Sequence, residues 1–64
     1  MNLEEERERR GISKEELAKV LNISLKTYYN WINGKTDIPS SKLIDMAEMF
    51  NVSIDYLLGI KQKN

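Results

Sequence analysis

The stretch "NISLKTYYNWINGK", residues 22–35, carries two tyrosines and a tryptophan among lysines and asparagines. If it is helical, Tyr28 and Trp31 lie three residues apart and therefore on one face. The opposite face then carries Leu25, Lys26, Tyr29, Asn30 and Asn33. The fold depends on which of these two faces is buried, and the function depends on which one is exposed.

Capping residues delimit this helix on both sides. Ser24 is a good N-cap, and Gly34 suits the left-handed conformation that closes a helix. Asn22 can end the preceding helix in the same conformation, while Ile23 can enter the core between the two helices. About three residues therefore separate two short helices, which forces a sharp turn.

The preceding segment "SKEELAKVL", residues 13–21, predicts the partner helix of this turn. Ser13 and Glu16 have the spacing of a capping box, in which each side chain bonds the other's backbone N–H. The apolar positions at helical spacing are Leu17, Val20 and Leu21. Ala18 is small where the next helix must cross at close range.

Three further helices are expected, and no strand. The first begins after Asn2 and ends before Gly11, and it can pack only through Leu3 and the stems of its arginines. The fourth begins near Pro39, with Ser40 or Ser41 at its start. Its expected buried face consists of Leu43, Ile44, Ala47 and Phe50.

Asn51 is expected to end the fourth helix as Asn22 ends the second. Ser53 then caps a short fifth helix that closes before Gly59. The apolar residues of this helix are Ile54, Leu57 and Leu58. Residues 61–64 are expected to fray.

Size and composition limit the classes of function. The 64 residues have room for a single domain, and a chain with neither cysteine nor histidine has no disulfide and no Cys/His zinc site. No signal peptide or membrane-spanning run is present, so we expect a cytoplasmic protein. The formal net charge is zero, which argues against a strongly basic nucleic-acid binder. Residues 11–42 nevertheless carry five lysines and three carboxylates, a net charge of +2.

The segment "SKEELAKVLNISLKTYYNWINGK", followed by "VSIDYLLG", resembles the helix-turn-helix family of phage Cro and C1 repressors, also called the XRE family. The joint order of Ala18, the short turn, "NGK" and the closing motif makes the resemblance specific. It implies an all-α, compact five-helix fold like that of lambda repressor. A single domain over residues 1–64 is expected, with the helix-turn-helix at about 13–33.

The resemblance also assigns the two faces of the third helix. Family positions matching Tyr28 and Trp31 are apolar and buried, and Ile32 is expected to be half buried. Residues at the start of this helix and one turn later enter the DNA major groove in the family. Base reading therefore maps onto Leu25, Lys26 and Asn30, with Tyr29 at its edge. The alternatives are a solvated face for Lys26 and Asn30, and local packing for Leu25 and Tyr29.

Phosphate contacts are expected on both sides of the reading helix. Lys14 stands where the family commonly has glutamine, and it would present a point charge to the DNA backbone. Lys19 and Lys42 are expected to be solvated. The expected phosphate-binding residues are Lys14, Thr27, Asn33, Lys35, Ser40, Ser41 and Arg7. For Asn33 and the neighbouring Gly34, helix termination alone is an equal explanation.

Two departures from the family pattern concern the first helix. Arg7 matches an arginine that often pairs with a glutamate where this chain has Ile32. Arg7 is therefore expected to turn either to phosphate or to a carboxylate such as Glu4. Glu6 stands where many relatives have leucine, which leaves the packing of the helix open.

The resemblance implies a sequence-specific transcriptional regulator, a repressor of phage or bacterial type acting on nucleoid DNA. A single short reading helix contacts few bases, so we expect a homodimer on a pseudo-palindromic operator. The expected dimer residues are Ile54, Tyr56, Leu58 and Ile60. A protein-interaction module of the same fold, such as an antitoxin-like or antirepressor partner, is the alternative. An enzyme, a metal site, a cofactor or a small-molecule ligand is not expected.

Overall fold

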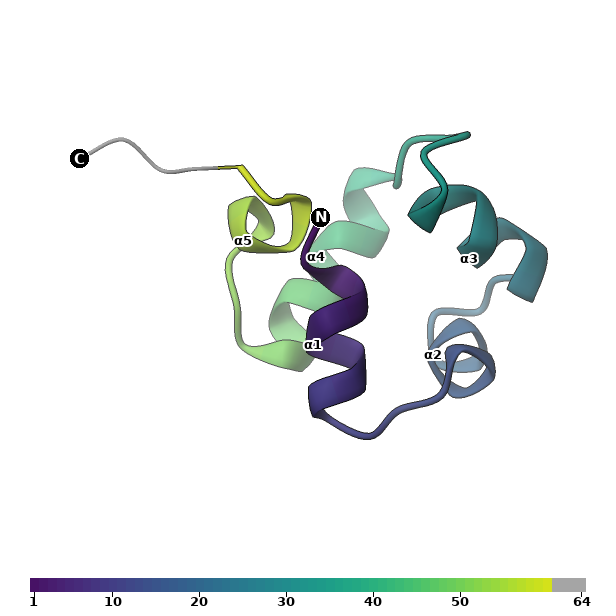
Figure 1. Ribbon diagram of the computed structural model, residues 1–64, viewed down its shortest axis with the longest axis horizontal. Coiled ribbons are helices and arrows are strands. Elements are labelled where there is room, and N and C mark those ends of the chain that lie inside the picture. Colours follow the sequence, from purple (N-terminus) through teal and green to yellow (C-terminus); the bar gives the residue numbers. More distant parts are fainter. Residues whose placement is uncertain (61–64) are drawn as a thin grey trace.

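Residues 1–60, which the structure describes, contain five helices and no strand in the computed structural model, so the predicted all-α fold is confirmed. The expectation for residues 61–64 lies outside the described residues. The helices are α1 (Leu3–Arg9), α2 (Lys14–Val20), α3 (Leu25–Ile32), α4 (Ser40–Phe50) and α5 (Ile54–Leu58) (Figure 1).

The predicted serine caps are all present. Ser13 Oγ accepts the Glu16 N–H at 3.0 Å, while Glu16 Oε1 accepts the Ser13 N–H at 3.0 Å, which completes the capping box. Ser24 Oγ accepts the Thr27 N–H, and Ser53 Oγ accepts the Tyr56 N–H. Local sequence therefore determines where α2, α3 and α5 begin.

The left-handed residues also stand where the sequence predicts them. Asn22 follows α2 with φ 58°, and Asn51 follows α4 with φ 55°. The turn between α2 and α3 is short because Asn22 reverses the chain directly after the last turn of α2. This turn sets α3 across α2.

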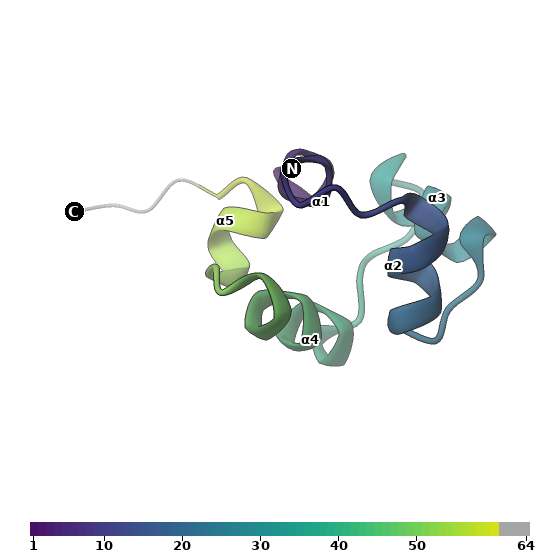
Figure 2. The same ribbon diagram turned by 90° about the horizontal axis from the view of Figure 1, so that it is seen from below.

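The helices surround one interior. α2 and α3 lie at one end of the molecule and α5 at the other, with α1 and α4 between them (Figure 1). The second view shows α1 and α4 on opposite sides of the interior (Figure 2). Asn2 joins the N-terminus to the end of α5, since its backbone N–H donates to Leu57 O at 2.9 Å and its side-chain amide donates to Tyr56 O at 2.8 Å.

Side chains from all five helices and from the end of α2 form the core. Its buried members are Leu3, Leu17, Ala18, Leu21, Tyr28, Trp31, Met46, Phe50 and Leu57. Ile23 and Ile32 are partly buried against it, as expected. Ala18 is almost fully buried, in agreement with the close approach of α2 and α3.

Two positions expected to be buried are exposed. Val20 is 67% exposed and Ile44 is 48% exposed, so both predictions are wrong. In α4 the inward stripe runs through Leu43, Met46 and Phe50, at i, i+3 and i+7, and Met46 is fully buried. Ile44 lies one residue off this stripe. Leu17 and Ala18 of α2, with Leu21 directly after it, face the interior and leave Val20 in solvent.

α1 packs through more than the expected apolar contacts, because a buried carboxylate lies at its centre. Glu6 is buried and forms ion pairs with Arg9 and Arg10, the second at 2.8 Å. The Arg10 guanidinium lies 5.1 Å from the centroid of the Phe50 ring and also donates to Phe50 O. Arg9 donates to the Tyr56 hydroxyl at 3.1 Å. Glu6 therefore contributes to the packing of α1 through two arginines: Arg10 contacts α4 and Arg9 contacts α5.

The longest helix among residues 1–60 has 11 residues, and none of the helices described has the length and apolar character needed to cross a membrane.

Candidate nucleic-acid interface

Two buried aromatic side chains hold α3 in place. Tyr28 and Trp31 are both buried, which confirms the expectation that they belong to the core. Their ring centroids lie 6.3 Å apart and their planes are tilted by 56°. The Tyr28 hydroxyl reaches α1 and donates a hydrogen bond to Glu4 Oε1. The inward face of α3 is thus fixed against both the core and α1.

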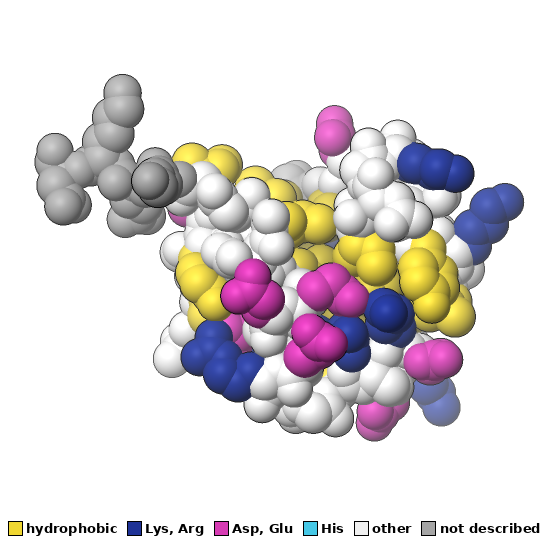
Figure 3. All heavy atoms as spheres, viewed as in Figure 1, with side chains coloured by type: hydrophobic (Ala, Val, Ile, Leu, Met, Phe, Trp, Pro, Cys, Tyr) yellow, Lys and Arg dark blue, Asp and Glu magenta, His cyan; other side chains and the backbone are white. Residues whose placement is uncertain are grey.

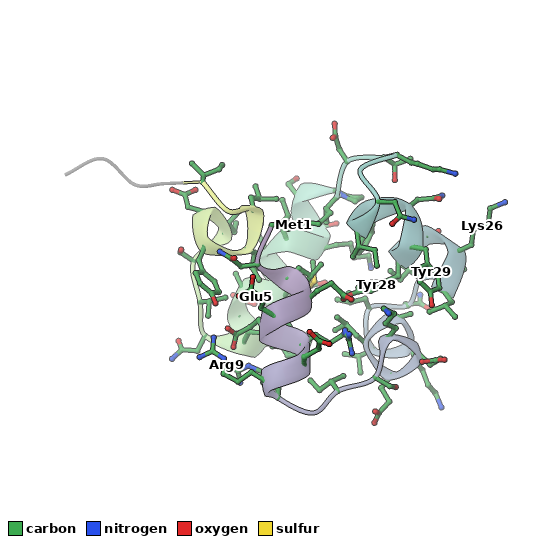
Figure 4. The ribbon with its side chains drawn as sticks, in the orientation of Figure 1. Met1, Glu5, Arg9, Lys26, Tyr28 and Tyr29 are labelled. Carbon is green, nitrogen blue, oxygen red and sulfur yellow. The ribbon has the colours of Figure 1, made fainter. Side chains whose placement is uncertain are left out.

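The outward face of α3 presents polar groups suited to reading base edges. Lys26 is exposed and extends away from the molecule (Figure 4), while Leu25 and Asn30 are half-buried. A lysine can donate to guanine O6 and N7, an asparagine can pair with adenine N6 and N7, and an aliphatic side chain can contact a thymine methyl. All three chemistries are available on one side of a single helix.

Tyr29 differs from the other candidates for base reading. It is 41% exposed, and the Lys14 ammonium lies 5.5 Å from the centroid of its ring. Tyr29 therefore lies beside the start of α2 as well as on α3 (Figure 4).

Thr27 and Ser24 form a local network at the start of α3. The Ser24 hydroxyl donates to Thr27 Oγ1 at 2.9 Å, and Ser24 Oγ accepts the Thr27 N–H at 3.0 Å. Thr27 is half-buried, and this network gives its hydroxyl a defined position. Thr27 Oγ1 can still donate its own proton outward.

The end of α3 combines helix termination with exposed polar groups. The Asn33 N–H donates to Tyr29 O at 3.0 Å, and the Lys35 N–H donates to Asn30 O at 2.9 Å. Gly34 has φ 75°, and a Cβ there would meet no atom within 4 Å, so its conformation rather than crowding requires glycine. The side chains of Asn33 and Lys35 are exposed.

The first turn of α4 offers backbone donors. Ser40 and Ser41 are exposed, and as the first two residues of the helix their N–H groups have no intrahelical acceptor. Pro39 precedes them at the N-cap position and makes no side-chain cap. Amides at the start of a helix of this length suit an anion.

Lys14 and Arg7, both expected near phosphate, contact the same carboxylate. Lys14 Nζ lies 3.8 Å from Glu4 Oε2, and the lysine side chain is 32% exposed. Arg7 Nε donates to Glu4 Oε1 at 2.9 Å and its Nη1 donates to Ile12 O at 2.6 Å. Arg7 is only 8% exposed. Of its two expected partners, the structure places Arg7 with Glu4, which argues against a phosphate contact.

The contacts of Glu4 change its acidity. Burial raises the pKa of Glu4, but hydrogen bonds from Arg7 and Tyr28 and the charges of Arg7 and Lys14 outweigh this and hold it below its usual value. Burial and the hydrogen bond to Glu4 raise the pKa of the Tyr28 hydroxyl. Glu4 is therefore a carboxylate at neutral pH and Tyr28 a neutral donor.

The four expected dimer residues lie on or after α5. Ile54, Tyr56 and Leu58 are half-buried and Ile60 is exposed, while Leu57 between them closes the core. Figure 3 shows hydrophobic side chains gathered over α5 and the start of α1, with a second group over α3 beside cationic side chains.

A contact of Lys42 and two contacts of Glu4 could not be predicted from the sequence. Lys42, expected to be solvated, donates from Nζ to Leu21 O at 2.7 Å and so binds the end of α2 from α4. Glu4 was considered only as a partner of Arg7, yet it also contacts Tyr28 and Lys14. No local pattern signals these three contacts, because the partners are distant in the chain and meet only after the helices pack.

Comparisons with known proteins agree with this arrangement. A model of the helix-turn-helix family matches residues 3–57, from the first residue of α1 into α5. The HTH-type transcriptional regulator ImmR of Bacillus subtilis (strain 168) is 34% identical over 65 residues, which cover 97% of this chain and 51% of that protein. The crystal structure of a transcriptional regulator from Listeria innocua matches with a TM-score of 0.84 and 32% identity, over 98% of this chain and 59% of that chain. This chain spans about half the length of the curated relative it matches.

Proposed function

This chain belongs to the helix-turn-helix family of the Cro/C1 (XRE) type, a family of DNA-binding transcriptional regulators, and we propose that it reads a specific DNA sequence in the major groove through α3. The observation that carries the proposal is the division of α3 into two faces. Tyr28 and Trp31 hold one face in the core, and the other face carries the exposed Lys26 and the half-buried Asn30.

Base reading is assigned to Leu25, Lys26 and Asn30. A bidentate contact of Lys26 or Asn30 with a base contributes about 1 to 3 kcal/mol of discrimination against the wrong base pair. Phosphate binding is assigned to groups on either side of α3, which set its register in the groove. These groups are Lys14, Thr27, Asn33, Lys35, Ser40 and Ser41.

The protein acts as a homodimer on a pseudo-palindromic operator. Each subunit contributes one reading helix of eight residues, so a second copy doubles the number of bases contacted. Half-sites about 34 Å apart, or roughly 10 base pairs, would suit two such helices. The α5 region, with Ile54, Tyr56, Leu58 and Ile60, supplies the dimer contact. Ile60 is exposed and the other three are half-buried, so the region leaves apolar surface uncovered, which supports this assignment.

The likeness to Cro and C1 proteins supports a repressor that acts on nucleoid DNA in the cytoplasm by occupying its operator. The zero net charge implies modest nonspecific affinity, so specific contacts must supply most of the discrimination. Binding should weaken steeply between low and moderate salt. An apolar protein-interaction module would bind its partner with little response to salt.

Selection of duplexes from a random DNA pool tests the proposal. The wild-type protein should enrich an inverted repeat, and Lys26→Ala and Asn30→Ala should each lose part of it while folding is unchanged. Lys19→Ala is the matched control, because it removes the same charge from an exposed position on α2 and should leave the recovered sequence unaltered. No enrichment at low salt would refute DNA reading.

A further inference from the structure

We propose that Tyr29 is a positioning residue rather than a base-reading one, and that with Glu4 it holds the Lys14 ammonium where it meets a DNA phosphate. Glu4, Lys14 and Tyr29 together form the Lys14 cluster. The inference deepens the proposed function and rests on it. It assigns to α1 a part in DNA binding that requires no contact between α1 and DNA.

Three helices meet at this cluster. Glu4 comes from α1, Lys14 is the first residue of α2, and Tyr29 lies in the middle of α3. The Lys14 Nζ atom is 3.8 Å from Glu4 Oε2 and 5.5 Å from the centroid of the Tyr29 ring. The ammonium therefore lies between a carboxylate and an aromatic face, both of which attract a cation.

The carboxylate in this cluster is itself held in place. Glu4 Oε1 accepts hydrogen bonds from Arg7 Nε and the Tyr28 hydroxyl, and Glu4 Oε2 accepts one from Arg7 Nη2 at 3.2 Å. Tyr28 is fully buried and Arg7 nearly so. The position of Glu4 is thus determined by the core, and the position of Lys14 follows from it.

Stability alone does not account for a lysine at this place. The first turn of a helix carries the positive end of the helix dipole, so a cation there is unfavourable. A partly exposed ion pair contributes little to folding. The first turn of α2 also contains Glu15 and Glu16, which suit the dipole, whereas Lys14 does not. Neighbours that hold a cation at an unfavourable position are consistent with a role for that cation outside the domain.

The cluster leaves Lys14 able to bind a further anion. An ammonium has three N–H donors. The contact to Glu4 is longer than a hydrogen bond, and the contact to Tyr29 is with the ring face. With 32% of its side chain exposed, Lys14 can reach a phosphate without leaving its neighbours.

The same geometry separates Tyr29 from base reading. Lys14 approaches one face of the Tyr29 ring, so that face already has a partner within the domain. Tyr29 then affects DNA binding through Lys14. Its ring is needed for this and its hydroxyl is not.

Salt titrations of binding to the selected duplex test the proposal. Lys14→Met should weaken binding roughly threefold to tenfold and reduce the salt slope by about one, as expected for the loss of one phosphate contact. Tyr29→Leu should also weaken binding and reduce the salt slope. Tyr29→Phe should have the affinity and the salt slope of the wild type. In the Lys14→Met background, Tyr29→Leu should have no further effect. Lys19→Met is the control, because it removes the same charge from the same helix. In a protein that carries Lys19→Met, Tyr29→Leu should still weaken binding by its full factor.

A second measurement needs no DNA. The Tyr29 ring should shift the ε-methylene proton resonances of Lys14 upfield in the NMR spectrum of the free protein. Tyr29→Leu should abolish the shift and Tyr29→Phe should retain it. Thermal unfolding of each variant confirms that the fold is intact.

Three outcomes would contradict the positioning role of the Tyr29 ring, and a fourth would contradict DNA binding itself. Multiplicative effects of Lys14→Met and Tyr29→Leu would show that Tyr29 contacts DNA independently. Equal losses in Tyr29→Phe and Tyr29→Leu would assign the effect to the hydroxyl, and an unchanged salt slope in Tyr29→Leu would refute the positioning role. Each of these leaves the proposed function standing. Absence of DNA binding by the wild type would overturn both.

Discussion

The Tyr28 hydroxyl donates a hydrogen bond to Glu4 Oε1 and thereby joins the middle of α3 to α1. Tyr28 is fully buried whereas the Glu4 side chain is 30% exposed, so this bond forms at the edge of the core. Because Glu4 also accepts bonds from Arg7, the orientation of α3 depends on α1 as well as on α2. The helix that presents Lys26 and Asn30 is therefore supported from two sides.

Tyr28→Phe should lower the free energy of unfolding by about 1.5 to 3 kcal/mol, the usual contribution of a hydrogen bond to a charged group. Glu4 keeps its bonds to Arg7, so no buried charge is left unpaired. Urea unfolding measures the change, and an unchanged m-value would show that compactness is preserved. Tyr29→Phe is the control and should alter stability by less than about 0.5 kcal/mol. Equal destabilisation by the two variants would contradict the proposed role of the Tyr28–Glu4 bond.

Trp31→Ala should unfold the domain rather than weaken DNA binding selectively. The loss of a buried aromatic side chain costs about 3 to 5 kcal/mol, which is most of the stability of a domain this small. Circular dichroism should show loss of helix at 25 °C. Lys26→Ala, on the exposed face of the same helix, should retain the wild-type spectrum. A folded Trp31→Ala protein with reduced DNA affinity would show that Trp31 acts at the interface.

Acid should destabilise the domain through its carboxylates. Burial raises the pKa of Glu6, but the hydrogen bond from Arg10 and the charges of Arg9 and Arg10 lower it below its ordinary value of 4.5. The pKa of Glu4 is lowered as well. A depressed pKa in the folded state stabilises the protein above the unfolded-state value, and this stability is lost as the pH falls through the folded-state pKa. We expect the melting temperature to be level near neutral pH and to fall below about pH 4.5.

Glu6→Leu isolates one part of this acid response. Replacing a buried ion network with an apolar residue is often neutral or stabilising, and both arginines retain exposure to solvent. The melting temperature of the variant should fall less between pH 6 and pH 3 than that of the wild type. Glu5→Leu, at an exposed position one residue earlier, should keep the wild-type pH dependence. The same acid sensitivity in both variants would show that Glu6 does not contribute.

Gly34→Ala should destabilise the domain by about 1 to 2 kcal/mol, because φ 75° is unfavourable for a residue with a Cβ. The space around this position is open, so a steric clash would not contribute. Asn22→Gly is the opposite change, since it places a glycine where the chain has φ 58°. This variant should leave the stability of the domain unchanged or raise it. Thermal melts measure both changes. If Gly34→Ala leaves stability unchanged but weakens DNA binding, the glycine is needed for close approach to DNA.

Local chemistry accounts for the parts of the fold that could be predicted. Ser13, Ser24 and Ser53 begin their helices, and Asn22 and Asn51 end theirs, because capping depends on residues within a few positions of one another. The division of α3 into two faces was also predictable, since a helix places i and i+3 together. The composition of the exposed face of α3 followed from the same spacing.

The sequence by itself determined the helices, their ends and the two faces of α3. Only the tertiary structure decided which of several apolar residues face inward, because Val20 and Ile44 have the same local character as Leu21 and Leu43. It also brought Glu4 to Tyr28 and Lys14, and Lys42 to Leu21, across distances in the chain that no local pattern spans. The physical reason is that caps act within one turn of backbone, whereas side chains from separate helices meet only once the core has set the helices' relative positions.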